Sequence, residues 1–116
     1  MADSAHLDPT CILVIDDEPE VRAYLELALA ALGRPVVAAV DLPPGRPAVA
    51  LVDLLLGCAS GLPLIEALRA QGVPVVAISG LARDAAPVEA ARQAGAVVLG
   101  KPFGLQELRE VVRRLL

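Results

Sequence analysis

The feature that most constrains the fold is an alternation, repeated along the chain, of Val- and Ile-rich runs with segments of helical periodicity. The runs are apolar at successive positions rather than at every second one, which is typical of strands buried on both faces of a parallel sheet. They lie at residues 12–16, 35–40, 48–53, 74–79 and 96–99. The alternation predicts one α/β domain built around five parallel strands.

Helices are expected between most of these strands. Apolar residues at helical spacing, with proline near the start or glycine near the end of several segments, predict helices at 19–32, 62–71, 87–94 and 105–116. The segment 41–47 reads DLPPGRP, and its three prolines and one glycine exclude a helix of useful length. We therefore expect four helices and one missing crossover helix, the second.

Composition narrows the class of protein. A length of 116 residues suits one domain, and a formal charge of −4 with a pI near 4.8 argues against nucleic acid as a direct partner. The most apolar stretch, 47–65, has Asp53 near its centre, which argues against a membrane span. Cys11 and Cys58 lack the spacing of a zinc site or a redox pair, and the N-terminus has no signal-peptide pattern, so the cytoplasm is the expected location.

Polar residues follow the predicted strands at their carboxyl ends. These residues are Asp16, Asp17, Asp53, Ser79 and Lys101. Open parallel sheets gather functional groups at this edge, so three carboxylates, a hydroxyl and an ammonium are expected in one crevice. Three carboxylates held together favour a divalent cation, and hard oxygen ligands suit Mg²⁺.

Each of these residues also has a purely structural explanation. The pair of aspartates could cap the first helix, Ser79 before Gly80 could belong to a turn, and Lys101 could be a solvated surface lysine. Asp53 is harder to explain in this way, because it closes a strand expected to be buried. The occurrence of all of them at the ends of four different strands favours a functional site.

Four motifs together resemble the receiver domain of two-component response regulators. They are VIDDEPEVR, LVDLLLGCASG, VVAISG and GKPF, and the resemblance runs from about residue 11 to residue 116. Gly61, eight positions after Asp53, also matches. The resemblance implies a flavodoxin-like, doubly wound five-stranded parallel sheet of order 2-1-3-4-5, with the second helix missing or reduced. Residues 1–10 are then expected to form a flexible N-terminal tail and residues 11–116 the receiver domain.

The resemblance also implies a magnesium site. Asp17 would bind Mg²⁺ directly, Asp16 mostly through water, and Asp53 and the backbone carbonyl of Leu55 would complete the protein ligands. Without the metal, we expect the acidic residues to titrate as a coupled set, with some pKa values raised by repulsion between like charges.

The phosphoryl chemistry implied by the resemblance centres on Asp53. This carboxylate would be the nucleophile that accepts a phosphoryl group from a phosphohistidine. Ser79 would hydrogen-bond a phosphoryl oxygen, and Lys101 would pair with Asp53 at rest and with the phosphoryl group afterwards. The bond between Lys101 and Pro102 would be cis, since proline greatly reduces the preference for trans.

The sequence departs from the family pattern at several positions. Gly57 stands where a proline is usual, and Leu55 is apolar where many relatives are polar. Val98 replaces the aromatic residue that usually reports phosphorylation, and Pro87 delays the start of a short helix. Switching at the usual output face is therefore expected to differ.

Several functions remain open from the sequence. The leading hypothesis is a bacterial signalling receiver, not a turnover enzyme, that acts through a histidine kinase or phosphotransfer protein and a downstream protein target, as a monomer or weak dimer. A receiver cut from a longer chain is also possible. The alternative is a receiver-like interaction module that acts independently of phosphorylation. An aspartyl-phosphate phosphatase ranks lower, because Leu55 stands where such enzymes have a second acid. A flavin protein also ranks lower, because no phosphate-binding loop follows the first strand.

Overall fold

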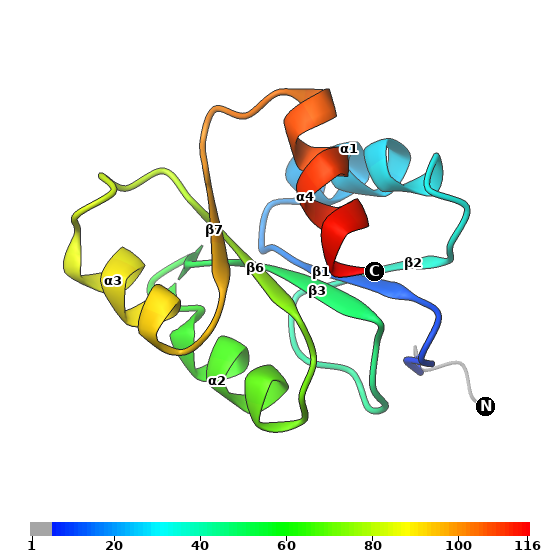
Figure 1. Cartoon of the computed structure of the whole chain (residues 1–116), viewed down its shortest axis with the longest axis horizontal. Coiled ribbons are helices and arrows are strands. Elements are labelled where there is room, and N and C mark those ends of the chain that lie inside the picture. Colours follow the sequence, from blue (N-terminus) through cyan, green and yellow to red (C-terminus); the bar gives the residue numbers. More distant parts are fainter. Residues whose placement is uncertain (1–5) are drawn as a thin grey trace.

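The computed structural model describes residues 6–116 and shows strands and helices alternating along the chain (Figure 1). The strands are β1 (Ile12–Ile15), β2 (Val36–Ala39), β3 (Val49–Asp53), β4 (Leu55–Leu56), β5 (Ala59–Ser60), β6 (Val75–Ser79) and β7 (Val97–Gly100). The helices are α1 (Pro19–Ala30), α2 (Leu62–Ala70), α3 (Ala86–Gln93) and α4 (Leu105–Leu115). The five strands and four helices expected from the sequence are confirmed, with boundaries that differ by one or two residues.

The main sheet has the order β2-β1-β3-β6-β7, and every neighbouring pair is parallel. This is the predicted order 2-1-3-4-5. The inner strands β1, β3 and β6 are buried at every position, as their continuous apolar sequences require. The edge strands β2 and β7 are only partly buried.

Two apolar layers pack the helices onto the sheet. Helices α1 and α4 cover one face through residues that include Leu25, Leu29 and Leu108. Helices α2 and α3 cover the other face through residues that include Ile65 and Val88 (Figure 1). No helix within residues 6–116 is long and apolar enough to cross a membrane.

The link between β2 and β3 contains no helix in the described chain, as its prolines predicted. The N-terminal segment packs beside it instead. The backbone N–H of Leu7 donates to the carbonyl of Pro44 at 2.9 Å, and Leu7 forms an isolated parallel bridge with Gly45. A Cβ on Gly45 would collide with the Leu7 backbone, so glycine permits this approach.

The tail predicted for residues 1–10 is therefore too long at its C-terminal end. Leu7 is 2% exposed and belongs to the apolar layer under α2 and α3. The packed domain begins at or before this residue rather than at residue 11, and residues 1–5 lie outside the described part of the chain. This packing could not be predicted, because Leu7 has no apolar run around it in the sequence.

A short antiparallel hairpin, β4–β5, follows β3 and was not predicted. It turns through Gly57, whose positive φ of 61° suits glycine. Gly61 closes the hairpin, donating its N–H to the carbonyl of Leu54 at 2.9 Å. A Cβ on Gly61 would collide with the carbonyl oxygen of Asp53, so the absence of a side chain lets the hairpin return against the end of β3.

Candidate functional site

The carboxyl ends of four strands meet at one edge of the sheet. Asp53 is the last residue of β3 and Ser79 the last of β6, while Asp16 and Lys101 directly follow β1 and β7. Parallel pairing holds them in neighbouring positions, since Ile15 lies beside Val52 and Asp53 beside Ile78. Asp16, Asp53 and Ser79 are the buried polar or charged residues of the described chain, at 1%, 4% and 2% exposed.

Asp53 and Lys101 form the central ion pair of this edge. The Lys101 ammonium donates from Nζ to Oδ2 of Asp53 at 2.9 Å, and the backbone N–H of Leu55 donates to Oδ1 at 2.8 Å. The Lys101 side chain is 34% exposed and that of Asp53 only 6%, so the pair stands at the boundary with solvent. Both oxygens of the buried carboxylate are satisfied.

The backbone around Lys101 also ties it to the neighbouring strand. Its N–H donates to the carbonyl of Ser79 at 2.7 Å, and the Lys101–Pro102 peptide bond is cis. Burial lowers the pKa of Lys101, but the hydrogen bond and negative charge of Asp53, with smaller contributions from Asp16 and Glu18, outweigh it. The pKa is therefore raised, and Lys101 is a cation at neutral pH.

Asp16 is the acid of the site whose burial is not fully compensated by hydrogen bonds. Its Oδ1 accepts the backbone N–H of Glu18 at 2.9 Å, but its buried Oδ2 has no hydrogen-bond partner. The pKa of Asp16 is raised to about 6, chiefly by burial and further by the nearby Asp53 carboxylate, which together outweigh the lowering effect of the Glu18 N–H. Burial is the main cause, and the repulsion between like charges that we expected adds to it.

Ser79 lies in the same cavity as the ion pair. A cavity of about 290 Å³ is lined by Asp53, Ser79, Gly80, Lys101 and a few neighbouring residues. The Ser79 hydroxyl oxygen accepts the backbone N–H of Leu81 at 2.9 Å, which is the turn contact expected from its structural explanation. Its own hydroxyl proton remains available to an acceptor in the cavity.

Asp17 is placed differently from the other acids. It is exposed, and its Oδ2 lies 3.3 Å from the position that a Cβ on Gly57 would occupy, beneath the β4–β5 hairpin. Within residues 6–116, no group of three or more His, Cys, Asp or Glu side chains is arranged to hold a metal ion. Asp16 and Asp53 thus lie close enough for their charges to interact, and Asp17 follows Asp16 directly at the same edge of the sheet.

The fit to a hard cation is therefore partial. The unpartnered Oδ2 of Asp16, next to the Asp53 carboxylate, is the kind of buried oxygen that a divalent cation would satisfy. Leu55 is positioned by its N–H bond to Asp53, and its side chain is 61% exposed at the mouth of the cavity.

Comparison with known proteins decides the family. The family described as "Response regulator receiver domain" matches residues 12–113, nearly the whole chain. The chain belongs to the response regulator receiver domain family. No curated protein matches the sequence closely.

Solved receiver structures share the fold. A CheY-like receiver domain protein from Methanospirillum hungatei has a TM-score of 0.82 at 22% identity, with 91% of this chain and 92% of that chain covered. The chemotaxis protein CheY4 of Vibrio cholerae gives 0.77 at 21%, covering 93% and 99%. The BeF₃-activated DrrB receiver domain, from a Thermotoga maritima protein, gives 0.77 at 22%, covering 92% and 97%. At such identities the likeness shows the fold alone.

Two features of this receiver domain were not foreseen as parts of the site. Glu18 and Leu81 line the cavity of Asp53, and Glu18 adds to the negative charge near Lys101. Their positions directly after the acidic pair and two residues after Ser79 were the only signals. Val98, the residue in place of the usual aromatic, is partly buried. It lines a second, larger cavity beside β7.

Proposed function

We propose that this receiver domain accepts a phosphoryl group on Asp53 and signals by protein–protein contact. The observation that carries the proposal is the ion pair between the buried Asp53 and Lys101, beside Ser79 and the unpartnered oxygen of Asp16. A carboxylate at the mouth of a cavity, with a cation and a hydroxyl beside it, has the groups that phosphoryl transfer needs.

The proposed reaction is a transfer from nitrogen to oxygen. An Asp53 carboxylate oxygen attacks the phosphorus of a phosphohistidine on a histidine kinase or phosphotransfer protein. The new O–P bond forms as the N–P bond breaks, and the imidazole leaves with the electron pair of that bond. Lys101 then neutralises charge on the phosphoryl oxygens, and the Ser79 hydroxyl donates a hydrogen bond to one of them.

A divalent cation, Mg²⁺, belongs to this proposal. Asp17 and Asp53 would hold it directly and Asp16 mostly through water, and the Leu55 carbonyl is the remaining candidate ligand. Bound there, it would neutralise the developing negative charge on the phosphoryl group. The proposed location is the cytoplasm, and the proposed assembly is a monomer or weak dimer.

Intact mass measurement tests the proposal. The protein is incubated with acetyl phosphate and Mg²⁺, with EDTA in a parallel sample, and compared with Asp53→Ala. We expect an adduct of one phosphoryl group that is labile to base, depends on Mg²⁺ and is lost in the variant. An adduct of equal size in Asp53→Ala would place the reaction elsewhere.

One observation favours a second function, an interaction module independent of phosphorylation. No group of three or more His, Cys, Asp or Glu side chains in the described part of the chain is arranged to hold a metal ion. This alternative predicts no adduct at any Mg²⁺ concentration and unchanged partner binding in Asp53→Ala. The same mass experiment therefore separates the two functions.

A further inference from the structure

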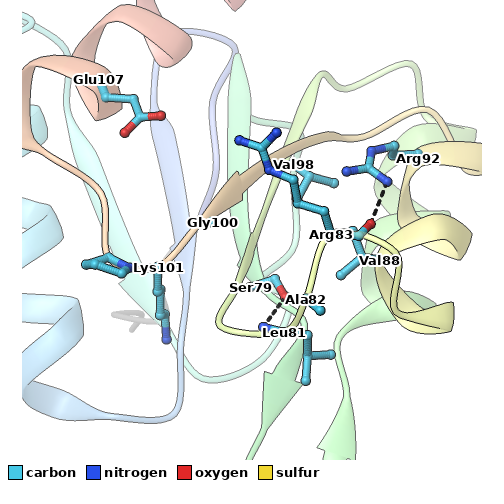
Figure 2. Close-up of a pocket in the computed structure, with 11 residues that line it drawn as sticks. Ser79, Leu81, Ala82, Arg83, Val88, Arg92, Val98, Gly100, Lys101 and Glu107 are labelled. Atoms are coloured by element: carbon cyan, nitrogen blue, oxygen red, sulfur yellow. Dashed lines mark hydrogen bonds between the residues drawn. The ribbon is translucent and has the colours of Figure 1, made fainter.

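A second cavity shares part of its wall with the cavity of Asp53. It has a volume of about 600 Å³, and Ser79, Leu81 and Lys101 line both cavities. It lies between α3, the loop that precedes α3, and β7 (Figure 2). The space is open because the lining residues Ala82, Val98 and Gly100 are small. Its volume is within the range of sites for small molecules.

The backbone at residue 100 does not require a glycine, so the open space beside it is not imposed by the backbone conformation. The φ of Gly100 is not positive, and the nearest atom to a Cβ built there is the Ser79 carbonyl oxygen at 3.9 Å, an ordinary contact distance. Val98 and Gly100 are two positions apart on β7 and so face the same side of the sheet. Larger side chains at these positions would fill the cavity.

The charges around the cavity are predominantly positive. Arg83, Arg92 and Lys101 line it with a single acid, Glu107. Figure 2 shows the two arginines on the side of the α3 segment and Glu107 on the side of α4. Arg92 and Lys101 are each paired with an acid outside this lining, so Arg83 is the cation of the lining best able to attract an anion.

The two arginines differ in their contacts. Arg92 donates to the backbone carbonyl of Arg83 at 3.0 Å (Figure 2). It also pairs with the exposed Glu89 at 3.4 Å, so it is held in place. The guanidinium of Arg83 makes no hydrogen bond or ion pair with any residue between 6 and 116. Its planar fork of donors is thus available to a carboxylate or phosphate.

We propose that this cavity binds a small organic anion, a carboxylate or phosphate carried on an apolar body. Arg83 receives the anionic group, with Arg92 and Lys101 nearby, while the apolar body lies against Val88 and Val98. This binding does not depend on phosphorylation of Asp53. Nothing in the cavity calls for a protein partner, since its walls enclose a volume of small-molecule size.

The shared wall links the two cavities. The Lys101 ammonium is engaged by Asp53 at 2.9 Å, and an anion in the second cavity draws on the same positive charge. Removing the Asp53 charge therefore strengthens anion binding, and by reciprocity a bound anion weakens the hold of Lys101 on Asp53. The site would in this way report an anionic metabolite to the phosphorylation site.

Nuclear magnetic resonance titration of the unphosphorylated protein tests the site. The probes are 1-naphthoate and 1-naphthyl phosphate, with the neutral 1-naphthamide as the matched control. We expect saturable amide shifts at Arg83, Val98 and Gly100 with the anions at concentrations up to about 10 mM, and at least tenfold weaker binding of the amide. The stronger of the two anions identifies the preferred anionic group.

Variants distinguish the site from general attraction. Arg83→Met should weaken naphthoate binding at least fivefold, while Arg114→Met, a matched change at an exposed position of α4, should leave it unchanged. Gly100→Val should abolish binding. Arg83 is exposed, so its variant is expected to fold even if the glycine variant does not. Absence of saturable shifts, equal binding of naphthamide, or equal effects of the two arginine variants would overturn the proposal.

The link to Asp53 has its own measurement. Asp53→Asn should tighten naphthoate binding about threefold, by releasing the Lys101 charge. The control Glu66→Gln removes one negative charge from the exposed side of α2 and should leave the affinity unchanged. Equal affinities in the wild type and Asp53→Asn would refute the link. Because no phosphoryl donor is present, the result is separate from the test of the proposed function.

Discussion

At the scale of single residues, Asp16 is the side chain whose burial is least compensated. One oxygen accepts a backbone N–H and the other has no partner, at 1% exposure and next to Asp53. Its pKa of about 6 lies above the ordinary value of 3.8, so the folded state binds more protons than the unfolded state between these values. The free energy of unfolding therefore falls as pH rises through this window, and Asp16 destabilises the metal-free fold above about pH 6.

Asp16→Asn tests this directly. The variant removes the buried charge and keeps an oxygen that can accept the N–H of Glu18. In EDTA we expect it to raise the free energy of unfolding at about pH 8 by on the order of 1 kcal/mol, with no gain near pH 4. Urea denaturation at both pH values measures the difference. The control Asp17→Asn changes an exposed acid and should have little effect, whereas an equal gain at both pH values would show that charge is not the cause.

Leu55 is a second single residue with a testable role, in the hydrolysis of the proposed aspartyl phosphate. Leu55 and Leu81 are 61% and 46% exposed, and both line the Asp53 cavity, so we expect their apolar side chains to restrict the access of water. Leu55→Asn provides an amide that can orient water, so we expect hydrolysis of the aspartyl phosphate to accelerate roughly three- to tenfold. Loss of the mass adduct over time measures the rate. Leu27→Asn, at a 78% exposed position on α1, is the control, and equal rates in all three proteins would refute the role of Leu55.

At the scale of elements, prediction succeeded where one segment contains its own signal. The strands β1, β3 and β6 were found because each is apolar throughout, and the absent helix because prolines occupy its place. The β4–β5 hairpin was missed because its two-residue strands are too short to show a period. The contact of Asp17 with the hairpin at Gly57 could not be predicted, because the sequence sets the place of Asp17 after β1 but not its rotamer.

Gly61 joins the hairpin to the site at this scale. A Cβ there would meet the carbonyl of Asp53, a backbone atom that cannot move without shifting the end of β3. We expect Gly61→Ala to lower the free energy of unfolding by roughly 1–3 kcal/mol and to slow phosphorylation of Asp53. Thermal unfolding and the mass assay measure the two effects. Gly104→Ala is the control, since nothing lies within 4 Å of its Cβ position, and similar stabilities for both variants would argue against the collision.

At the scale of the whole molecule, the two faces of the sheet are covered unequally. Helices α1 and α4 pack on one face, while on the other α2 and α3 leave the region of β1 and β2 to the segment between β2 and β3. Leu7 fills part of that region, together with Leu42 and Val37. Leu7, which was predicted to lie outside the domain, thus covers part of the sheet face that the missing helix would otherwise cover.

Leu7→Ala measures how much the packing of Leu7 on the sheet contributes to the free energy of unfolding. Leu7 is 2% exposed, and its backbone is held by the hydrogen bond to the carbonyl of Pro44. Shortening its side chain therefore leaves a cavity that the proline-rich segment is poorly able to close. We expect the free energy of unfolding to fall by about 2–3 kcal/mol, at the lower end for buried leucines because the site lies near the surface. Urea denaturation should show a lower midpoint with an unchanged slope. Leu27→Ala, at an exposed position of α1, should change the midpoint little, and equal midpoints for the two variants would mean that β1 and β2 are stable without the N-terminal segment.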